Sequence, residues 1–196
     1  MKKICVLAGI LISLVVTGIV VNTKQSQMQR ELAEEVFRFH VLANSDSEKD
    51  QALKMQVKEA VIAYMKEEIP QSDSVETTKA WARGHLNAIE NLAEAVIREE
   101  GYDYSVTVEV ATCEFPDKTY GDITFPSGKY EALRIKIGEA KGQNWWCVLY
   151  PNLCFIDAVH AVVPEKGKKD LKKVLDDDAY EMVTATSRFK IGWFFF

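Results

Sequence analysis

The sequence contains none of the short motifs that usually identify a hydrolase, a nucleotide-binding protein or a zinc protein. It has no glycine-rich loop that would cradle a phosphate, and no Gly-x-Ser-x-Gly turn that would present a nucleophilic serine. Its three histidines are scattered, and its closest cysteine pair has six residues between its members, too many for a zinc knuckle. There is also no internal repeat. We therefore expect no metal and no cofactor.

An excess of positive charge is also missing. The chain has 24 lysines and arginines against 29 aspartates and glutamates, and a formal net charge of −5. Because Lys2 and Lys3 lie at the extreme N-terminus, the rest of the chain has 22 basic against 29 acidic side chains. Nucleic acids and anionic bilayers attract basic protein surfaces. We therefore expect neither of them to be the main partner of the folded part.

What the sequence does contain is one long hydrophobic run at its N-terminus. Residues 4–21 include no charged side chain, follow directly on Lys2 and Lys3, and give way to polar residues at Asn22. A run of this length is at the lower limit for a membrane-spanning helix and exceeds the core of a typical signal peptide. The two lysines favour export of the chain that follows. We predict that residues 1–21 are a signal peptide or a membrane anchor; the weak cleavage motif at residues 16–18 leaves both alternatives open.

The composition of the remaining chain indicates a short tether and one domain. Residues 22–34 are polar without an apolar period, as in a tether or the start of a short helix, and residues 35–196 form a single predicted extracytoplasmic α+β domain. The length is sufficient for one domain with a real core. Three cysteines, Cys113, Cys147 and Cys154, lie in this part, where an oxidising environment permits one disulfide beside one buried thiol.

Apolar periodicity predicts the order of helices and strands. The first strand lies near residues 36–43, where apolar side chains alternate with Arg38 and His40 and so form one buried face. We predict an α+β fold in which two long helices pack on one face of a mostly antiparallel sheet, preceded by an N-terminal hydrophobic helix. The expected helices cover residues 48–69, 74–100, 154–163, 168–175 and 178–184. The expected strands at 105–113, 129–137 and 145–150 form an antiparallel meander, with a long loop at 115–128. Residues 189–196 form a last strand or a docking segment.

Polar side chains gather where the first strand meets the first long helix. Arg38 and His40 share one face of the strand, and Asn44, Asp46 and Asp50 follow in the turn and the start of the helix. A cation, an imidazole, an amide and two carboxylates at one junction are typical of an active or binding site. In a purely structural interpretation, Asp46 or the serine after it caps the helix. We favour the structural interpretation over catalysis and leave the binding of a partner open.

A second group of residues contains two tryptophans and two cysteines. Cys147 and His40 have the residue types of a thiolate–imidazole pair, in which the thiolate is the nucleophile. However, Cys147 lies in an apolar run, where burial raises the pKa of a thiol, and Cys154 is near enough in sequence to form a disulfide with it. We therefore favour a disulfide or buried thiols over a nucleophile. The pair Trp145 and Trp146 is either exposed for binding or part of the core.

The chain resembles the stage II sporulation protein R family of endospore-forming bacteria. The segments that carry the resemblance are FRFHVLANSDSEKDQALK (37–54), the loop at 113–122, ALRIKIG (132–138) and NWWCVLYPNLCF (144–155). The tail from about Asp176 onward shows no match. The resemblance implies a signalling protein, not an enzyme, that is made in the forespore and exported into the space between forespore and mother cell. It implies that the protein triggers an aspartic protease of the mother-cell membrane, stage II sporulation protein GA, which removes the pro-sequence of sigma-E.

Three functions are therefore under consideration. We favour an exported ligand of the membrane protease, with the five polar residues of the strand–helix junction as partner-binding residues. The alternative is an exported hydrolase acting on cell wall or peptide, with His40, Asp46 and Cys147 as its working groups. The third is a membrane-tethered module that holds two membranes together.

Overall fold

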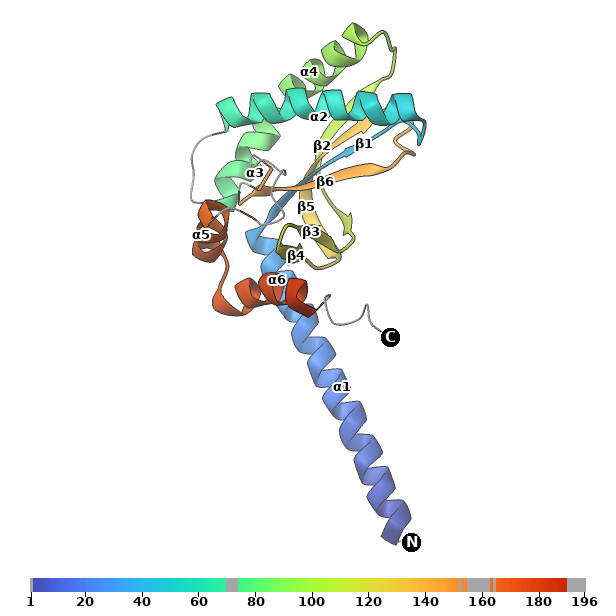
Figure 1. The fold of residues 1–196 in the computed structure, drawn as a ribbon, viewed down its shortest axis with the longest axis vertical. Coiled ribbons are helices and arrows are strands. Elements are labelled where there is room, and N and C mark those ends of the chain that lie inside the picture. The colour runs from blue at the N-terminus through green and yellow to red at the C-terminus, as the bar shows by residue number, and fades with distance from the viewer. Residues whose placement is uncertain (1, 70–73, 152, 155–162, 164, 190–196) are drawn as a thin grey trace.

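A computed structural model describes residues 2–69, 74–151, 153–154, 163 and 165–189 of the chain (Figure 1). The helices are α1 (Lys2–Glu35), α2 (Glu48–Glu68), α3 (Val75–Gly84), α4 (Leu86–Glu99), α5 (Glu165–Val174) and α6 (Asp177–Phe189). The strands are β1 (Phe37–Leu42), β2 (Val106–Phe115), β3 (Lys118–Tyr120), β4 (Ile123–Phe125), β5 (Gly128–Ile137) and β6 (Asn144–Tyr150). The predicted α+β class is confirmed.

Four of the strands form a mixed sheet in the order β2-β5-β1-β6. The central strand β1 is parallel to β5 and antiparallel to β6, while β2 is antiparallel to β5. The predicted meander is wrong, because β1 is inserted between β5 and β6, which follow each other in sequence. All six residues of β1 are buried, and a strand that is buried on both faces is stable in the centre of a sheet and not at its edge.

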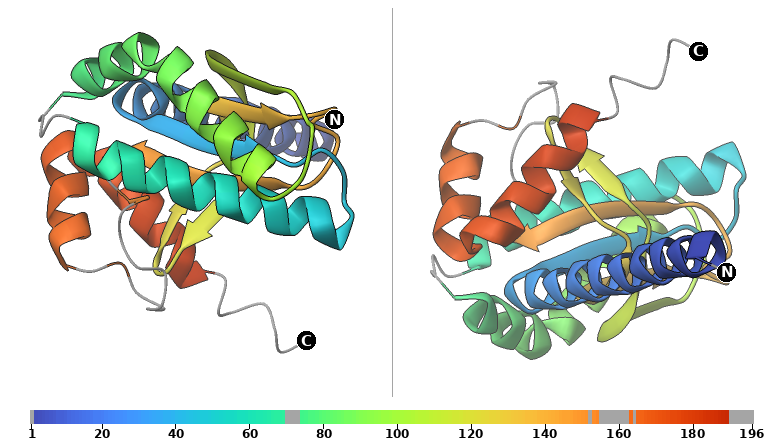
Figure 2. Two further views of the ribbon diagram at one scale, coloured as in Figure 1. Left: turned by 90° about the horizontal axis from the view of Figure 1, so that it is seen from above. Right: turned by 90° about the horizontal axis from the view of Figure 1, so that it is seen from below.

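One face of the sheet is covered by α2, α3 and α4, and we call it the helical face (Figure 2). The core here contains alternate residues of β1, Phe37, Phe39 and Val41, together with the apolar stripe of α2. The helix predicted over residues 74–100 is divided into α3 and α4 at His85, whose φ of −114° and ψ of 10° interrupt the helical backbone. Its imidazole Nδ1 lies 2.7 Å from the carbonyl oxygen of Trp81 in α3.

The opposite face of the sheet is covered over only part of its area. The predicted loop at residues 115–128 contains a hairpin of β3 and β4, which packs with α6, α5 and the last turns of α1 into a second apolar cluster. The segment 22–34, predicted as a tether or the start of a short helix, is helical, and its Leu32 is fully buried in this cluster. The predicted helices at 168–175 and 178–184 correspond to α5 and α6.

The long helix α1 extends away from the domain (Figure 1). It exposes Val16, Ile19 and Val20, which have 52%, 60% and 62% of their surface accessible. Within the part of the chain that the structure describes, no helix combines the length and the apolar character needed to cross a membrane. Most of the helix predicted at 154–163 and nearly all of the tail at 189–196 lie outside the described residues.

Candidate functional site

The structure does not bring the five predicted partner-binding residues together. Arg38 and His40 extend from β1 toward the face opposite the helical face, and they are 0% and 2% exposed. Asn44, Asp46 and Asp50 lie beyond the end of β1, in the turn that leads to α2 and in its first turn. The junction therefore consists of two groups with different surroundings.

The turn between β1 and α2 is organised around the buried carboxylate of Asp50. Its Oδ2 accepts hydrogen bonds from Asn44 Nδ2 at 2.9 Å and from Ser45 Oγ at 2.5 Å. These bonds, that from Ser45 first, hold the pKa of Asp50 below its usual range. Ser47 is the N-cap of α2, because its Oγ accepts the backbone N–H of Asp50 at 3.2 Å. These contacts agree with the structural interpretation of the turn.

The same turn is fastened to the loop between β5 and β6. Asp46 Oδ1 accepts the backbone N–H of Gln143 at 2.7 Å, and Asn44 Oδ1 accepts that of Glu139 at 3.0 Å. Lys54 of α2 donates to the carbonyl oxygen of Gln143 at 3.0 Å. Asn44 and Asp46 thus accept backbone N–H groups of the facing loop, while the Asp50 carboxylate accepts side-chain hydrogen bonds from within the turn, and all three have a supporting role.

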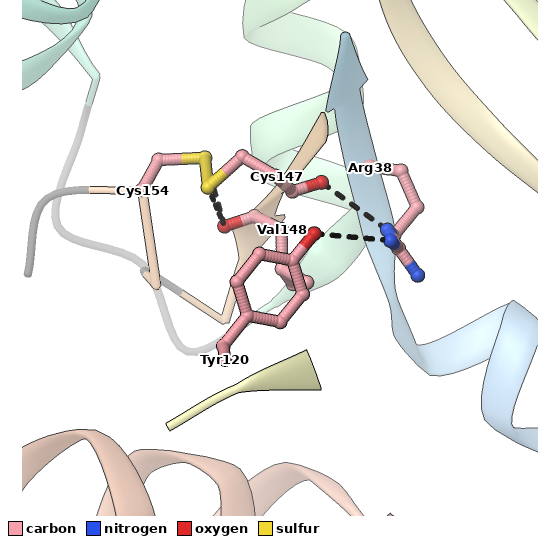
Figure 3. The surroundings of a disulfide bond; sticks show 5 residues. All are labelled: Arg38, Tyr120, Cys147, Val148 and Cys154. Carbon is pink, nitrogen blue, oxygen red and sulfur yellow. Dashed lines mark hydrogen bonds between the residues drawn. A yellow bond between two sulfur atoms is a disulfide. The ribbon is translucent and has the colours of Figure 1, made fainter. Parts of the chain in front are cut away.

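Arg38 is a buried cation surrounded by aromatic rings. Its Nε donates to the carbonyl oxygen of Cys147 at 3.1 Å, and its Nη2 donates to Tyr120 Oη at 3.2 Å (Figure 3). The guanidinium carbon lies 4.4 Å from the ring centre of Phe115 and 4.9 Å from that of Tyr130. No carboxylate of the described residues forms an ion pair with it. Burial lowers the pKa of Arg38, but a guanidinium stays charged, so cation–π contacts stabilise it.

Cys147 and Cys154 form a disulfide on the other side of β6 from Arg38 (Figure 3). The backbone N–H groups of Leu153 and Cys154 both donate to the carbonyl oxygen of Val148, so the chain after β6 folds back on the strand. The interpretation of Cys147 and His40 as a thiolate–imidazole pair is wrong. Cys147 belongs to the core of the helical face, whereas His40 lies on the opposite face of the sheet.

His40 lies in a row of four residues that crosses the whole sheet. The row runs Trp146, His40, Arg134, Glu109, one residue from each of β6, β1, β5 and β2. The imidazole stacks on Trp146 with ring centres 4.9 Å apart and planes 15° apart. Burial, and then the cations Arg134 and Arg38, lowers the pKa of His40 to about 3. The imidazole is therefore neutral at physiological pH.

The thiol beside His40 belongs to Cys113, a residue that the sequence did not single out. Its Sγ lies 3.6 Å from His40 Nε2, and burial raises the pKa of the thiol. A neutral imidazole beside a neutral thiol is not an activated nucleophile. The groups proposed for a hydrolase, His40, Asp46 and Cys147, are separated into three different environments. Among the described residues, no cluster of three histidine, cysteine or acidic side chains is placed to hold a metal.

Alternation within the strands was the available signal for this row. Glu109 and Cys113 in β2, and Arg134 and Lys136 in β5, occupy alternate positions and so share one face of the sheet. The alternation is visible in each strand by itself, but the strand order, which places Arg134 beside His40, is not.

Fold and site together define an α+β domain with a polar junction that supports the backbone and a row of polar and aromatic groups across its sheet. The chain belongs to the stage II sporulation protein R family. The family model described as Stage II sporulation protein R (spore_II_R) matches residues 33–160. The chain is 33% identical over 189 residues to Stage II sporulation protein R of Bacillus subtilis (strain 168), an alignment that covers 90% of this chain and 84% of the relative. No solved structure matches the chain. The resemblance seen in the sequence is confirmed, and with it a place in sporulation.

Proposed function

We propose that this protein is an exported signal that activates a membrane-embedded aspartic protease of the mother cell, stage II sporulation protein GA, so that pro-sigma-E is processed during sporulation. The observation that carries the proposal is membership of the stage II sporulation protein R family over residues 33–160. The activity belongs to the protease in this proposal, and the present chain acts as its ligand.

The site supports a binding role in preference to a catalytic one. The polar side chains of the turn are already occupied, because Asn44 and Asp46 hold the loop between β5 and β6 and the Asp50 carboxylate accepts hydrogen bonds from within the turn. Cys147 is in a disulfide, and burial keeps both His40 and Cys113 in their uncharged forms. A protein with these properties presents surfaces for recognition and does not supply an activated nucleophile.

The N-terminal segment supports export. Residues 4–21 are uninterrupted by charge and follow two lysines, as in a signal peptide or membrane anchor. The disulfide between Cys147 and Cys154 is of a kind that persists in oxidising compartments. We propose that the domain acts in the space between the forespore and mother-cell membranes, either released or held by its N-terminal helix.

A ligand activates a protease only if it binds the active conformation more tightly than the inactive one. A change from 1% to 99% active protease requires a preference of roughly 10⁴-fold. Such a preference demands a sizeable, specific contact surface on the ligand, and not a single charged residue.

Reconstitution tests this function directly. The protease is placed in proteoliposomes with pro-sigma-E inside, and the purified full chain is added outside. We expect pro-sigma-E to be cleaved only when folded chain is present outside and the protease has its catalytic aspartates. Cleavage that is equally fast without the chain, or that survives removal of those aspartates, would refute the proposal.

A further inference from the structure

The sheet face opposite the helical face is only partly covered, and its uncovered part has a distinct composition. The hairpin, α6 and the end of α1 cover Arg38, Tyr130 and Val148. The remaining area consists of two cross-strand rows and Cys113, and we call it the open face. The rows are Trp146, His40, Arg134, Glu109 and Asn144, Leu42, Lys136, Thr107. Thr107 is exposed, and all the others except His40 and Leu42 are partly exposed, so no layer of the described chain covers these rows.

Three buried polar atoms on this face have no hydrogen-bond partner among the described residues. They are His40 Nδ1, Arg134 Nε and Asn144 Oδ1. The side chain of His40 is 2% exposed, so water has little access to its ring. An unpaired polar group in such a position costs roughly 1–3 kcal/mol. Arg38 Nη1, in the covered part of the same sheet face, is unpaired as well, so these atoms form a polar layer beneath the open face, and a partner would contact the partly exposed groups above it.

The charge of the open face is opposite to that of the whole protein. Arg134 and Lys136 lie within 3.1 Å and 3.2 Å of the single carboxylate of Glu109. Lys118 adds a third cation from β3, with its Nζ 5.8 Å from the centre of the Trp146 ring. Three cations against one carboxylate give a local positive surface on a chain of net charge −5.

We propose that the open face binds an extended, acidic segment of a partner protein. A carboxylate of that segment would pair with the Arg134 guanidinium and Lys136, which share Glu109 between them. The ring of Trp146, which is partly exposed, would contact an apolar side chain beside the acidic ones. This inference rests on the proposed function: the partner is the part of the membrane protease that faces the space between the two membranes.

The position of Thr107 allows a matched test by charge. Thr107 and Thr112 are both exposed threonines of β2, but they lie on opposite faces of the sheet, because an odd number of positions separates them. Thr107 pairs with Lys136 in register and therefore lies on the open face, whereas Thr112 lies on the helical side. Thr107→Glu and Thr112→Glu change the net charge and strand propensity equally.

The variants are compared as full chains added to the protease proteoliposomes. In 50 mM salt, we expect Thr107→Glu to raise the concentration for half-maximal activation by about tenfold and Thr107→Lys to lower it by roughly threefold. Thr112→Glu should match the wild type. Because these charges are solvent-exposed, the effect of Thr107→Glu should shrink to about twofold in 500 mM salt. Equal effects of the two glutamate variants, or weaker activation by Thr107→Lys, would overturn the proposal.

Binding is measured separately from activation by the thiol of Cys113. A bound partner should slow the modification of Cys113 by a maleimide at least fivefold, as followed by peptide mass spectrometry, and Thr107→Glu should restore the free rate. Unchanged folding of each variant is checked by its melting temperature. If Thr107→Glu instead changes the molar mass of the chain in solution, a second copy occupies the face and the proposal is wrong.

The outcomes separate this inference from the function on which it rests. If the wild type activates the protease and all variants match it, the open face is wrong and the function stands. If the protease protects Cys113 of the wild type from the maleimide but is not activated, the proposed function is wrong. The order of the variants in the binding measurement then decides whether the open face is the binding surface. If the wild type does neither, both are wrong.

Discussion

Acid should destabilise this protein through one buried histidine, His40. Its pKa is about 3 in the folded protein and about 6.5 in an unfolded chain. Between these values, unfolding is accompanied by the uptake of one proton. The stabilising effect of keeping His40 neutral is therefore fully present about one pH unit above 6.5 and is lost as the pH falls toward 3. The slope reaches about 1.4 kcal/mol per pH unit below pH 6, and the loss amounts to roughly 2.3 kcal/mol between pH 6.5 and 4.5.

Urea unfolding at a series of pH values measures this effect. The free energies of unfolding of the wild type and His40→Gln are followed by tryptophan fluorescence, and their difference is plotted against pH. Taking the difference removes the contribution of carboxylates that titrate in the same range. We expect the wild type to lose about 2.3 kcal/mol more than the variant between pH 6.5 and 4.5. Parallel curves, or an NMR signal of the His40 imidazole that titrates near pH 6.5 in the folded protein, would refute the reasoning.

Further substitutions test other parts of the structure by urea unfolding at pH 7. Arg38→Lys should lower the free energy of unfolding by roughly 2–3 kcal/mol, because lysine cannot make the Nε hydrogen bond or stack on the aromatic rings; a loss below 0.5 kcal/mol would contradict this. Gly142→Ala should lower the free energy of unfolding by roughly 1–3 kcal/mol, because the added Cβ would collide with the backbone carbonyl of Ser45. For Gly84→Ala, the added Cβ meets nothing within 4 Å, so the free energy of unfolding should stay the same or rise by up to about 1 kcal/mol. The double change of Cys147 and its partner to serine should cost about 2.5 kcal/mol from loop entropy, in line with a sequence separation of 7, and an unchanged midpoint would show that the bond does not stabilise the fold.

Local patterns were sufficient to predict most of the elements. The spacing of Leu53, Val57, Val61 and Met65 predicted α2, and all four side chains are buried. Alternation predicted β1, β2 and β5 to within a few residues. These features depend on neighbouring residues alone, because helical and strand periodicities are properties of the local backbone.

Strand order and the break between α3 and α4 could not be predicted in the same way. The pairing of β1 with β5 joins residues nearly a hundred positions apart, and nothing in either strand specifies the other. Alternation in β1 predicted one buried face, but Arg38 and His40 are buried too, because the hairpin covers Arg38 and the rings of Phe115 and Trp146 enclose His40. The hairpin was hidden within a loop whose prolines and glycines indicated turns.

The candidate site shows the same division between local and distant contacts. The cap at Ser47 could be predicted, because an N-cap involves residues three positions apart. The neighbours of His40 could not, because Cys113 is 73 residues away and Trp146 more than a hundred. The cysteine chosen as its partner, Cys147, lies one strand away and one residue out of phase, on the opposite face.

The unbroken course of α1 has a mechanical consequence for any signal the domain transmits. Its last turns are packed into the second apolar cluster through Leu32, and the helix continues to Lys2 without an interruption. From Leu32 back to Val21 the axis spans roughly 17 Å, at 1.5 Å per residue. A continuous helix of this kind is a rigid connection, whereas a flexible linker would let the domain rotate freely. Whatever holds the N-terminal end of α1 therefore also sets the distance of the domain from that point of attachment. It sets, too, the direction about the helix axis in which the row of Trp146, His40, Arg134 and Glu109 faces.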